Sequence, residues 1–423
     1  MSRSIIPLQN NLISKDDRNW VVRLAIRLIH GQLANLTNGQ LIVRDERDEW
    51  YFGELSDEFP RPVHIEVLHP SFYVDVAFGG TSGSGEAYMK GSWSCSDLLT
   101  LIRIFLRNRN VMDDMDYGFS RLKGPLHKLG HLLCRNTKEG SRKNISAHYD
   151  IGNDMFQLFL DPTMMYSSAY YEREDMTLSQ ASVAKIDLIC RKLHLTSDDH
   201  LLEIGTGWGG LAIHAASHYG CRVTTTTISQ EQYQLAVARV KQQGLEDRIT
   251  VLCEDYRDLT GKYNKLVSVE MIEAIGHQYM KTFFDKCADL LTPDGMMLLQ
   301  AITIADNNYE KALGDVDFIK KFIFPGGFLP SVSAMCDAIA AKTDMKMFHL
   351  QDIGPHYART LSDWRKRFFD NIDKVRDLGY GEEFTRLWEY YFCYCEGGFL
   401  ERDIGTVQML LTRPDCRIEP VRI

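Results

Sequence analysis

Four glycines fall within six positions of the chain, in the segment Gly205-Thr-Gly-Trp-Gly-Gly210. An apolar run, Leu201–Ile204, precedes them, and a helical pattern, Leu211–Tyr219, follows them. Glycines between a strand and a helix let the backbone approach a ligand closely at the helix N-terminus. The spacing differs from the dinucleotide pattern Gly-x-Gly-x-x-Gly and from the phosphate-binding loop that carries a Lys. Gly205 and Gly207 are therefore candidate ligand-binding residues, with a purely structural tight turn as the alternative.

Polar side chains follow the next expected strand, Arg222–Thr227. Thr227, Ser229 and Gln232 can each hydrogen-bond a ribose or an adenine, because each carries both donors and acceptors. Many Rossmann-like sites place an acidic residue here for the ribose hydroxyls. For Ser229, capping of the following helix is the alternative.

The third expected strand, Ile249–Cys253, also ends beside polar residues. Asp255 can accept a hydrogen bond from an exocyclic amine, and Tyr256 can stack on a base. Glu203 stands two positions before the first glycine, which resembles the first motif of class I S-adenosylmethionine (SAM) methyltransferases. Since three strand ends offer nucleoside chemistry, we expect SAM as the cofactor.

These side chains meet only if the strands lie parallel in one sheet. From about Asn144, strand-like runs alternate with helical ones, which predicts an α/β domain with a parallel sheet covered by helices on both faces. The expected strands are Leu201–Ile204, Arg222–Thr227, Ile249–Cys253, Lys265–Val269 and Met296–Ile302. The expected helices are Leu178–Leu193, Leu211–Tyr219 and Gln230–Gln243. We assign residues 144–423 to a catalytic domain.

Residues 1–120 have a different pattern and form a smaller expected α+β domain. An amphipathic helix is predicted over Trp20–Leu36, and a second helix over Asp97–Leu106 with Ser96 as its cap. The expected strands are Gly39–Arg44, Glu49–Gly53, His64–Val67, Phe72–Val76 and the short Glu86–Met89. A flexible turn is predicted over residues 79–85, which contain four glycines.

The charge distribution bears on the partners of the protein. A net charge of −9 over 423 residues argues against nucleic acid as a partner. Segment 121–143 nevertheless carries seven basic residues and one acidic residue, so its charge is +6. We interpret it as a basic linker that contacts anionic lipid headgroups, with a solvated linker as the alternative. No secretory signal, membrane span or Cys-x2-Cys zinc pair is visible, so we expect a cytoplasmic protein without a bound metal.

A further set of motifs, in order over residues 140–410, resembles the cyclopropane fatty acid synthases and related fatty-acyl methyltransferases. They are His148-Tyr-Asp-Ile-Gly-Asn153, Met165-Tyr-Ser-Ser-Ala-Tyr170, Gly205–Gly210, Thr227–Gln232, Asp255-Tyr-Arg-Asp258, Ser268-Val-Glu-Met-Ile-Glu273, Phe324-Pro-Gly-Gly-Phe-Leu-Pro330 and Arg402-Asp-Ile404. The resemblance implies a class I methyltransferase domain with a helical lid. It also implies a cis-unsaturated phospholipid acyl chain as the substrate, and it places Tyr166 and Ser167 near the SAM carboxylate and methyl group.

The resemblance also implies a mechanism. The alkene attacks the SAM methyl group, a carbocation forms on the acyl chain, and a base removes a proton from the new methyl group before the ring closes. In the ring-forming members this base is a bicarbonate ion held by a Cys, a Glu, a His and a Tyr. By motif, the Glu and the Tyr correspond to Glu273 and Tyr357, whereas the Cys and His positions hold Ser168 and Gln300.

A second departure is Glu270, at a position that is usually Gly in the ring formers. We hypothesise that its carboxylate occupies the bicarbonate position and serves as a built-in base. The alternative is that Glu270 points elsewhere and bicarbonate still binds. A displaced base could remove a different proton and give a methyl-branched or methylene chain instead of a ring. Cys395 stands where the family has a cysteine that has been suggested as an active-site residue, but we favour a structural role for Cys395.

The leading interpretation is thus a SAM-dependent methyltransferase that acts on unsaturated phospholipid chains. The alternatives are a small-molecule N-methyltransferase with the same fold and a non-catalytic lipid-binding relative. The separate N-terminal domain and the basic linker favour lipid, and the intact SAM motifs favour catalysis. We further expect a homodimer that associates peripherally with the inner face of the membrane.

Overall fold

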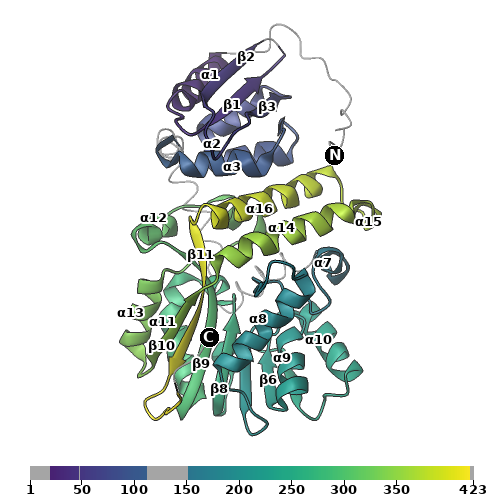
Figure 1. The fold of residues 1–423 in the computed structure, drawn as a ribbon, viewed down its shortest axis with the longest axis vertical. Coiled ribbons are helices and arrows are strands. Elements are labelled where there is room, and N and C mark those ends of the chain that lie inside the picture. The colour runs from purple at the N-terminus through teal and green to yellow at the C-terminus, as the bar shows by residue number, and fades with distance from the viewer. Residues whose placement is uncertain (1–19, 47, 112–150, 420–423) are drawn as a thin grey trace. The chain divides into compact units, whose positions relative to one another are not determined.

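The computed structural model describes residues 20–46, 48–111 and 151–419 (Figure 1). They belong to two compact units that divide at residues 124–125. The expected basic linker, residues 121–143, lies outside the described residues, as do His148 and Asp150 of the first family motif. No helix among the described residues is long and apolar enough to cross a membrane.

The described residues of the N-terminal unit, 20–111, contain a four-stranded sheet in the order β2-β1-β3-β4. Its strands are β1 (Gly39–Arg44), β2 (Glu49–Glu54), β3 (Val63–Val67) and β4 (Trp93–Cys95). Its helices are α1 (Trp20–Leu33), α2 (Ser71–Met89) and α3 (Leu98–Arg107). The first three predicted strands and both predicted helices are present, with small shifts of their ends.

Helix α2 replaces two predicted strands and the predicted glycine turn, so these predictions were wrong. Residues Phe72, Tyr73, Val76 and Ala77 are buried at helical spacing. The glycines permit a kink at Gly80, where φ is 56°, and a close approach at Gly83, where a Cβ atom would lie 2.0 Å from a backbone oxygen. The cap of α3 is also corrected, because the side chain of Asp97 accepts the hydrogen bond from Thr100 N.

The described residues of the C-terminal unit, 151–419, contain a seven-stranded sheet in the order β10-β11-β9-β8-β5-β6-β7. Its strands are β5 (His200–Ile204), β6 (Arg222–Thr226), β7 (Ile249–Leu252), β8 (Tyr263–Val269), β9 (Leu291–Ile304), β10 (Lys346–Asp352) and β11 (Ile404–Thr412). The predicted parallel order holds from β7 to β9. The sheet is mixed, however, because β11 and β10 add antiparallel strands beyond β9 that the sequence analysis missed.

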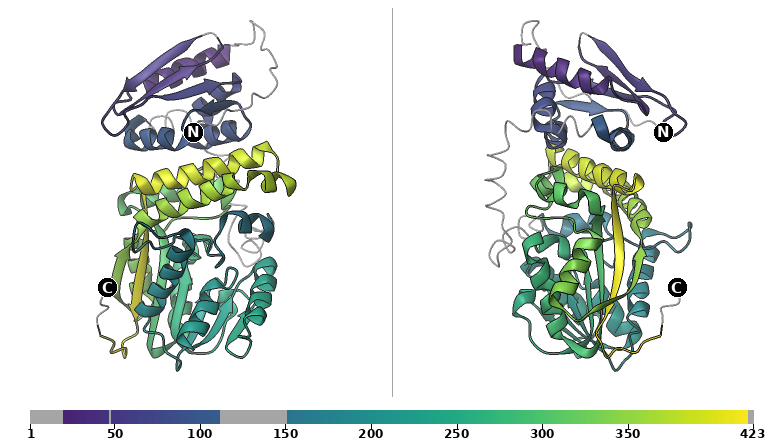
Figure 2. Two further views of the ribbon diagram at one scale, coloured as in Figure 1. Left: turned by 45° about the vertical axis from the view of Figure 1, so that its right-hand side comes forward. Right: turned by 90° about the vertical axis from the view of Figure 1, so that its left-hand side faces the viewer.

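Helices cover both faces of this sheet, as Figures 1 and 2 show. Apolar side chains of α8 (Leu178–Lys192), α9 (Gly210–His214), η1 (Ala215–Tyr219) and α10 (Gln230–Gln242) form the core on one face. On the other face the core includes side chains of η2 (Tyr256–Asp258), η3 (Ile272–Ala274), α11 (Met280–Leu290) and α13 (Val332–Lys342). The remaining short elements are η4 (His277–Tyr279), η5 (Asp306–Asn308), α12 (Tyr309–Leu313) and η6 (Ile319–Ile323).

A separate helical layer packs around aromatic rings. It consists of α7 (Asn153–Phe159), α14 (Gly354–Asp370), α15 (Ile372–Asp377) and α16 (Glu382–Leu400), with α14 and α16 side by side (Figure 1). The ring of Phe159 lies 5.9 Å from Trp364, 5.4 Å from Trp388 and 5.5 Å from Phe392, measured between ring centroids. These contacts join α7, α14 and α16, and they fix the orientation of α14, which carries Tyr357.

Candidate active site

The carboxylate of Glu270 lies at the centre of a set of hydrogen-bond donors. Its Oε1 atom accepts from the backbone N–H of Ser168 at 3.0 Å and from Nε2 of Gln300 at 2.8 Å. Its Oε2 atom accepts from the hydroxyl of Tyr357 at 2.7 Å. Charged acceptors form the stronger class of hydrogen bond, so three such bonds hold the carboxylate in one orientation.

Local backbone structure explains how Glu270 reaches these donors. The residue follows directly after β8, where Val269 pairs with Gln300 of β9, and its own N–H donates to the Gln300 carbonyl at 2.8 Å. Its φ of 49° is in the left-handed region, which costs a residue with a Cβ about 1–2 kcal/mol. Such strain persists where the surrounding contacts hold it in place, and it clusters at functional sites.

Ser168 contributes to the site through its backbone rather than its side chain. The residue is fully buried, and its hydroxyl donates to the carbonyl of Ala169 at 3.0 Å. The N–H of Ala169 in turn donates to the hydroxyl of Thr360 on α14 at 3.1 Å. Helix α14 therefore anchors the segment that directs the Ser168 N–H at Glu270.

Glu273 lies close enough to Glu270 for their charges to interact, but it makes different contacts. Its Oε1 atom accepts from the N–H of Ile302 at 2.6 Å, and its buried Oε2 atom has no hydrogen-bond partner among the described residues. Desolvation raises the pKa of the Glu273 carboxyl to about 8, and the charge of Glu270 adds to the increase. Glu273 is thus mainly protonated at neutral pH.

Desolvation also raises the pKa of the Glu270 carboxyl above its ordinary value. The hydrogen bonds from Gln300, Ser168 and Tyr357 act in the opposite direction, because they favour the ionised form. The positive charge of Lys185 also lowers the pKa of Glu270. Of the two carboxyl groups, Glu270 has the larger set of side-chain donors and a nearby cation, and these oppose the rise in its pKa.

Lys185 is a buried cation that the sequence analysis missed. Its side chain, on α8, has no exposed surface, and its Nζ atom donates to the hydroxyl of Ser167 at 2.8 Å. Desolvation lowers the pKa of Lys185 to about 8, and the charge of Glu270 is the largest influence opposing that shift. Lys185 thus orders Ser167 and supplies positive charge near Glu270.

Tyr166, between α7 and α8, and Cys395, on α16, both interact with Tyr357. The hydroxyl of Tyr166 donates to that of Tyr391 on α16 at 3.0 Å. Desolvation raises the pKa of the Cys395 thiol, and Cys395 affects the pKa values of both Tyr357 and Tyr391, which places it near them. A thiol with a raised pKa is a poor nucleophile, which supports a structural role for Cys395.

The glycine turn has the backbone conformation that its glycines suggest. Gly205 and Gly207 have φ values of 105° and 51°, in the region that side chains disfavour. Gly205 N–H donates to the carbonyl of Thr226 at 3.0 Å, which joins the turn to the end of β6. A Cβ atom at Gly205 would lie 3.3 Å from the side chain of Met271. The space at Gly205 is thus limited by Met271, whereas a Cβ atom at Gly207 would have nothing within 4 Å, so the turn is open to a closely approaching cofactor at Gly207.

The residues after β6 bind one another. The Thr227 hydroxyl donates to Oε1 of Gln232 at 2.8 Å and accepts from the N–H of Ser229 at 3.1 Å. The Ser229 hydroxyl accepts from the N–H of Gln232 and caps α10, as the alternative for this residue proposed. The three side chains thus form one preorganised polar cluster beside the glycine turn.

The residues after β7 have other partners within the chain. Asp255 accepts from Nε and Nη2 of Arg257 at 2.7 and 2.6 Å. The ring of Tyr256 lies in the hydrophobic core, 5.5 Å from the ring of Phe283, and its buried hydroxyl has no partner among the described residues. Amine binding by Asp255 and base stacking by Tyr256 stay predictions.

The family model for mycolic acid cyclopropane synthetase matches residues 136–409 of this chain. The chain belongs to this family. It is 37% identical over 355 residues to the cyclopropane-fatty-acyl-phospholipid synthase of Escherichia coli strain K12, an alignment that covers 83% of this chain and 88% of that protein. It is 35% identical over 343 residues to the tuberculostearic acid methyltransferase UfaA1 of Mycobacterium tuberculosis, which covers 79% of each chain.

Among solved structures, the C-terminal unit resembles mycolic acid cyclopropane synthase CmaA1 complexed with SAH and CTAB. The TM-score is 0.60 at 33% identity, and the match covers 64% of this chain and 98% of that one. These findings confirm the predicted family, the α/β methyltransferase fold and the assignment as a SAM-dependent methyltransferase. The roles of the individual site residues stay predictions.

Proposed function

We propose that this enzyme methylates the cis double bond of unsaturated fatty acyl chains in membrane phospholipids, with Glu270 as its base. The observation that carries the proposal is the Glu270 carboxylate, which accepts hydrogen bonds from Ser168, Gln300 and Tyr357. By resemblance these are three of the four positions that hold bicarbonate in the ring formers. The names of the relatives, a fatty-acyl-phospholipid synthase and a tuberculostearic acid methyltransferase, support the substrate class.

Bound SAM supplies an electrophilic methyl group to the double bond. We assign its binding to the glycine turn, the polar cluster and the flanking residues, namely Gly205, Gly207, Thr227, Ser229, Gln232, Asp255, Tyr256, Tyr166 and Ser167. The first seven follow the carboxyl ends of β5, β6 and β7, where sheets of this kind bind ligands. Lys185 orders Ser167 within this set through the hydrogen bond to its hydroxyl.

The chain's own residues then manage a positive charge and a proton. Methyl transfer converts the double bond into a carbocation on the acyl chain, and the ionised Glu270 carboxylate stabilises that cation before it accepts a proton. Loss of a proton from the new methyl group with ring closure gives a cyclopropane. Loss of a proton without ring closure gives a methylated or methylene alkene, and a saturated methyl branch then requires a separate hydride donor.

Glu270 and Glu273 have distinct roles in this scheme. The hydrogen bonds from Tyr357, Gln300 and the Ser168 N–H oppose the rise that desolvation causes in the pKa of Glu270, so we assign the proton-accepting role to this carboxylate. Glu273, with its pKa raised to about 8, stays protonated and adds no second negative charge. The competing proposal is that bicarbonate is the base, and that anion would have to displace Glu270 from the same three donors.

Product analysis with matched variants tests the assignment. The enzyme is incubated with SAM and vesicles of cis-unsaturated phospholipid, and mass spectrometry detects chains heavier by one carbon and two hydrogens. Glu270→Gln keeps the size of the side chain but not its charge, so we expect normal SAM affinity and turnover reduced by about 10²–10⁴-fold. Parental turnover by Glu270→Gln would exclude Glu270 as the base.

For the rest of the molecule we propose three parts, with residues 1–120 as a lipid-associating domain, 121–143 as a basic linker and 144–423 as the catalytic domain. The charge of +6 on the linker supports docking on an anionic membrane, because each basic residue near such a surface contributes about 1 kcal/mol. We propose a cytoplasmic homodimer that associates peripherally with the inner face of the membrane. Sedimentation with vesicles and size measurement in solution test these two properties separately.

A further inference from the structure

A continuous chain of hydrogen bonds connects Glu270 to a buried lysine on α8. The Nζ atom of Lys192 donates to Oε1 of Gln408 at 2.8 Å. The Nε2 atom of Gln408 donates to Oε1 of Gln300 at 3.0 Å, and Nε2 of Gln300 donates to Oε1 of Glu270 at 2.8 Å. The chain thus runs from a cation to the proposed catalytic carboxylate through two amide side chains.

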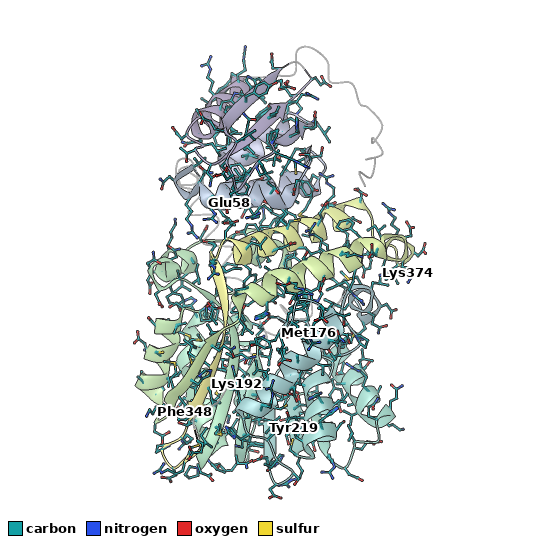
Figure 3. All side chains as sticks on the ribbon, in the orientation of Figure 1. Glu58, Met176, Lys192, Tyr219, Phe348 and Lys374 are labelled. Atoms are coloured by element: carbon teal, nitrogen blue, oxygen red, sulfur yellow. The ribbon has the colours of Figure 1, made fainter. Side chains whose placement is uncertain are left out.

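The elements of the C-terminal unit explain how these groups meet. Gln408 of β11 and Gln300 of β9 are directly paired across the two strands. They share a strand face with Leu410 and Leu298, and those leucines belong to the core that α8 covers. Figure 3 labels Lys192 on α8, where its side chain reaches β11.

The lysine and both amide side chains of this hydrogen-bond chain are buried, so an unsatisfied donor or acceptor among them would be costly. Lys192 is 1% exposed, and neither Gln300 nor Gln408 has any exposed surface. Among the described residues, no carboxylate lies within ion-pair distance of Lys192, and its second contact is Oε1 of Gln351 at 2.5 Å. Burial lowers the pKa of Lys192 to about 8, and its ammonium form depends on these two amide oxygens as hydrogen-bond acceptors.

The ends of the chain determine the direction of both amides. An ammonium group is only a donor, and an ionised carboxylate is only an acceptor, whereas an amide can turn either way. Lys192 fixes the Gln408 oxygen toward itself, so Gln408 must present its NH₂ group to Gln300. Gln300 must then present its own NH₂ group to Glu270. If Gln300 turned round, its oxygen would face the carboxylate and repel it.

We propose that Lys192 is a positioning residue, which acts through Gln408 to hold the Gln300 amide as a donor to Glu270. This inference rests on the proposed role of Glu270 as the base. Lys192 does not contact the substrate in this scheme. Its effect is to keep Glu270 in the orientation and the charge state that proton removal needs.

Gln408→Glu separates this role from simple packing. The new carboxylate keeps the size of the side chain and gives Lys192 an anionic partner, so the variant should be at least as stable as the parent. It cannot donate to Gln300, however, and it attracts the Gln300 NH₂ group away from Glu270. We expect kcat to fall by about 10- to 100-fold, the equivalent of one hydrogen bond to a charged group, with KM for lipid and SAM affinity unchanged.

Gln351→Leu is the matched control, because Gln351 accepts from the same Lys192 but is not part of the chain to Gln300. We expect Gln351→Leu to lower the melting temperature but to keep a near-parental kcat. We expect Gln408→Leu to lower both the melting temperature and kcat. Parental kcat in Gln408→Glu, or kcat losses that follow the melting temperature across all three variants, would overturn the inference. If Glu270→Gln loses turnover while Gln408→Glu keeps it, only the role of Lys192 is excluded. Full turnover by Glu270→Gln would instead exclude the proposed base.

Discussion

Replacement of Glu270 by Gly relieves the backbone strain at this residue and removes its carboxylate, so the two effects on stability can be compared. A Gly takes the φ of 49° without strain, which returns about 1–2 kcal/mol. The loss of the carboxylate leaves the donors on Ser168, Gln300 and Tyr357 without their acceptor. Each hydrogen bond to a charged group is worth about 1.5–3 kcal/mol, so the lost bonds outweigh the relieved strain. We therefore expect Glu270→Gly to be less stable than the parent in buffer without small anions.

The same variant leaves a space lined by three donors, which a small carboxylate can fill. Without a base, kcat should fall by about 10²–10⁴-fold. Added bicarbonate or formate should restore part of the turnover in a saturable manner and raise the melting temperature, because each binds only the folded state. In Glu270→Gln the amide still occupies the space, so that variant is the control that anions should not rescue.

The assay is product formation from unsaturated phospholipid vesicles, in bicarbonate-free buffer and then with increasing anion concentration. Melting temperatures are recorded on the same samples. The reasoning is refuted if the parent enzyme itself requires bicarbonate, because a built-in carboxylate would then be unnecessary. It is also refuted if Glu270→Gly gains neither turnover nor stability from the anions.

Three further predictions concern the cofactor, the membrane and pH. Gly205→Val places a β-branched side chain at a φ of 105°, so calorimetry should detect no SAM binding, and an unchanged affinity would disprove the site. Reversal of Arg121, Lys123, Lys128 and Arg135 to Glu should strongly weaken sedimentation with anionic vesicles at about 1 kcal/mol per residue, and equal sedimentation of variant and parent would exclude linker docking. The raised pKa of Glu273, from 4.5 to about 8, contributes stability that is complete below pH 4.5 and lost as the pH rises through 8. Glu273→Gln should therefore stabilise the protein more at pH 8 than at pH 5, and a difference in melting temperature that is independent of pH would contradict the shift.

The sequence predicted those parts of the fold in which local pattern and tertiary packing agree. The parallel strands β5 to β8 are short runs of apolar or β-branched residues bounded by glycine or polar residues, so their positions could be read directly. Helix α2 could not be read in this way, because its glycines normally indicate a turn. Gly83 is required there by a close approach to the Asp75 carbonyl, which only the folded structure reveals. Strand β10 is mostly exposed and has no strong apolar pattern.

The candidate site was predicted where residue type determines the contact and missed where the backbone determines it. Motif order placed Glu270 after β8, and the carboxylate does meet Tyr357 and Gln300. Motif order also placed Ser168 at the site, but its backbone N–H contacts the carboxylate and its hydroxyl does not. Every residue except proline has such a donor, so sequence alone cannot indicate which one will point at a carboxylate.

The spacing of the two lysines of α8, Lys185 and Lys192, already indicates in the sequence that they lie on the buried face of the helix. Buried residues recur along this helix every three or four positions, at Leu178, Ser182, Lys185, Ile189 and Lys192. Lysines on a buried face usually have polar partners. Because Lys185 and Lys192 lie on the same face as Leu178 and Ile189, their spacing predicts polar groups in the layer that α8 covers. Those groups are Ser167 and Gln408, and each leads toward Glu270 or the proposed cofactor site. One helix face therefore brings two positive charges to a site whose proposed chemistry passes through a cation. That site can favour the reaction only if Glu270 stays ionised, which is why its three donors matter as much as the carboxylate itself.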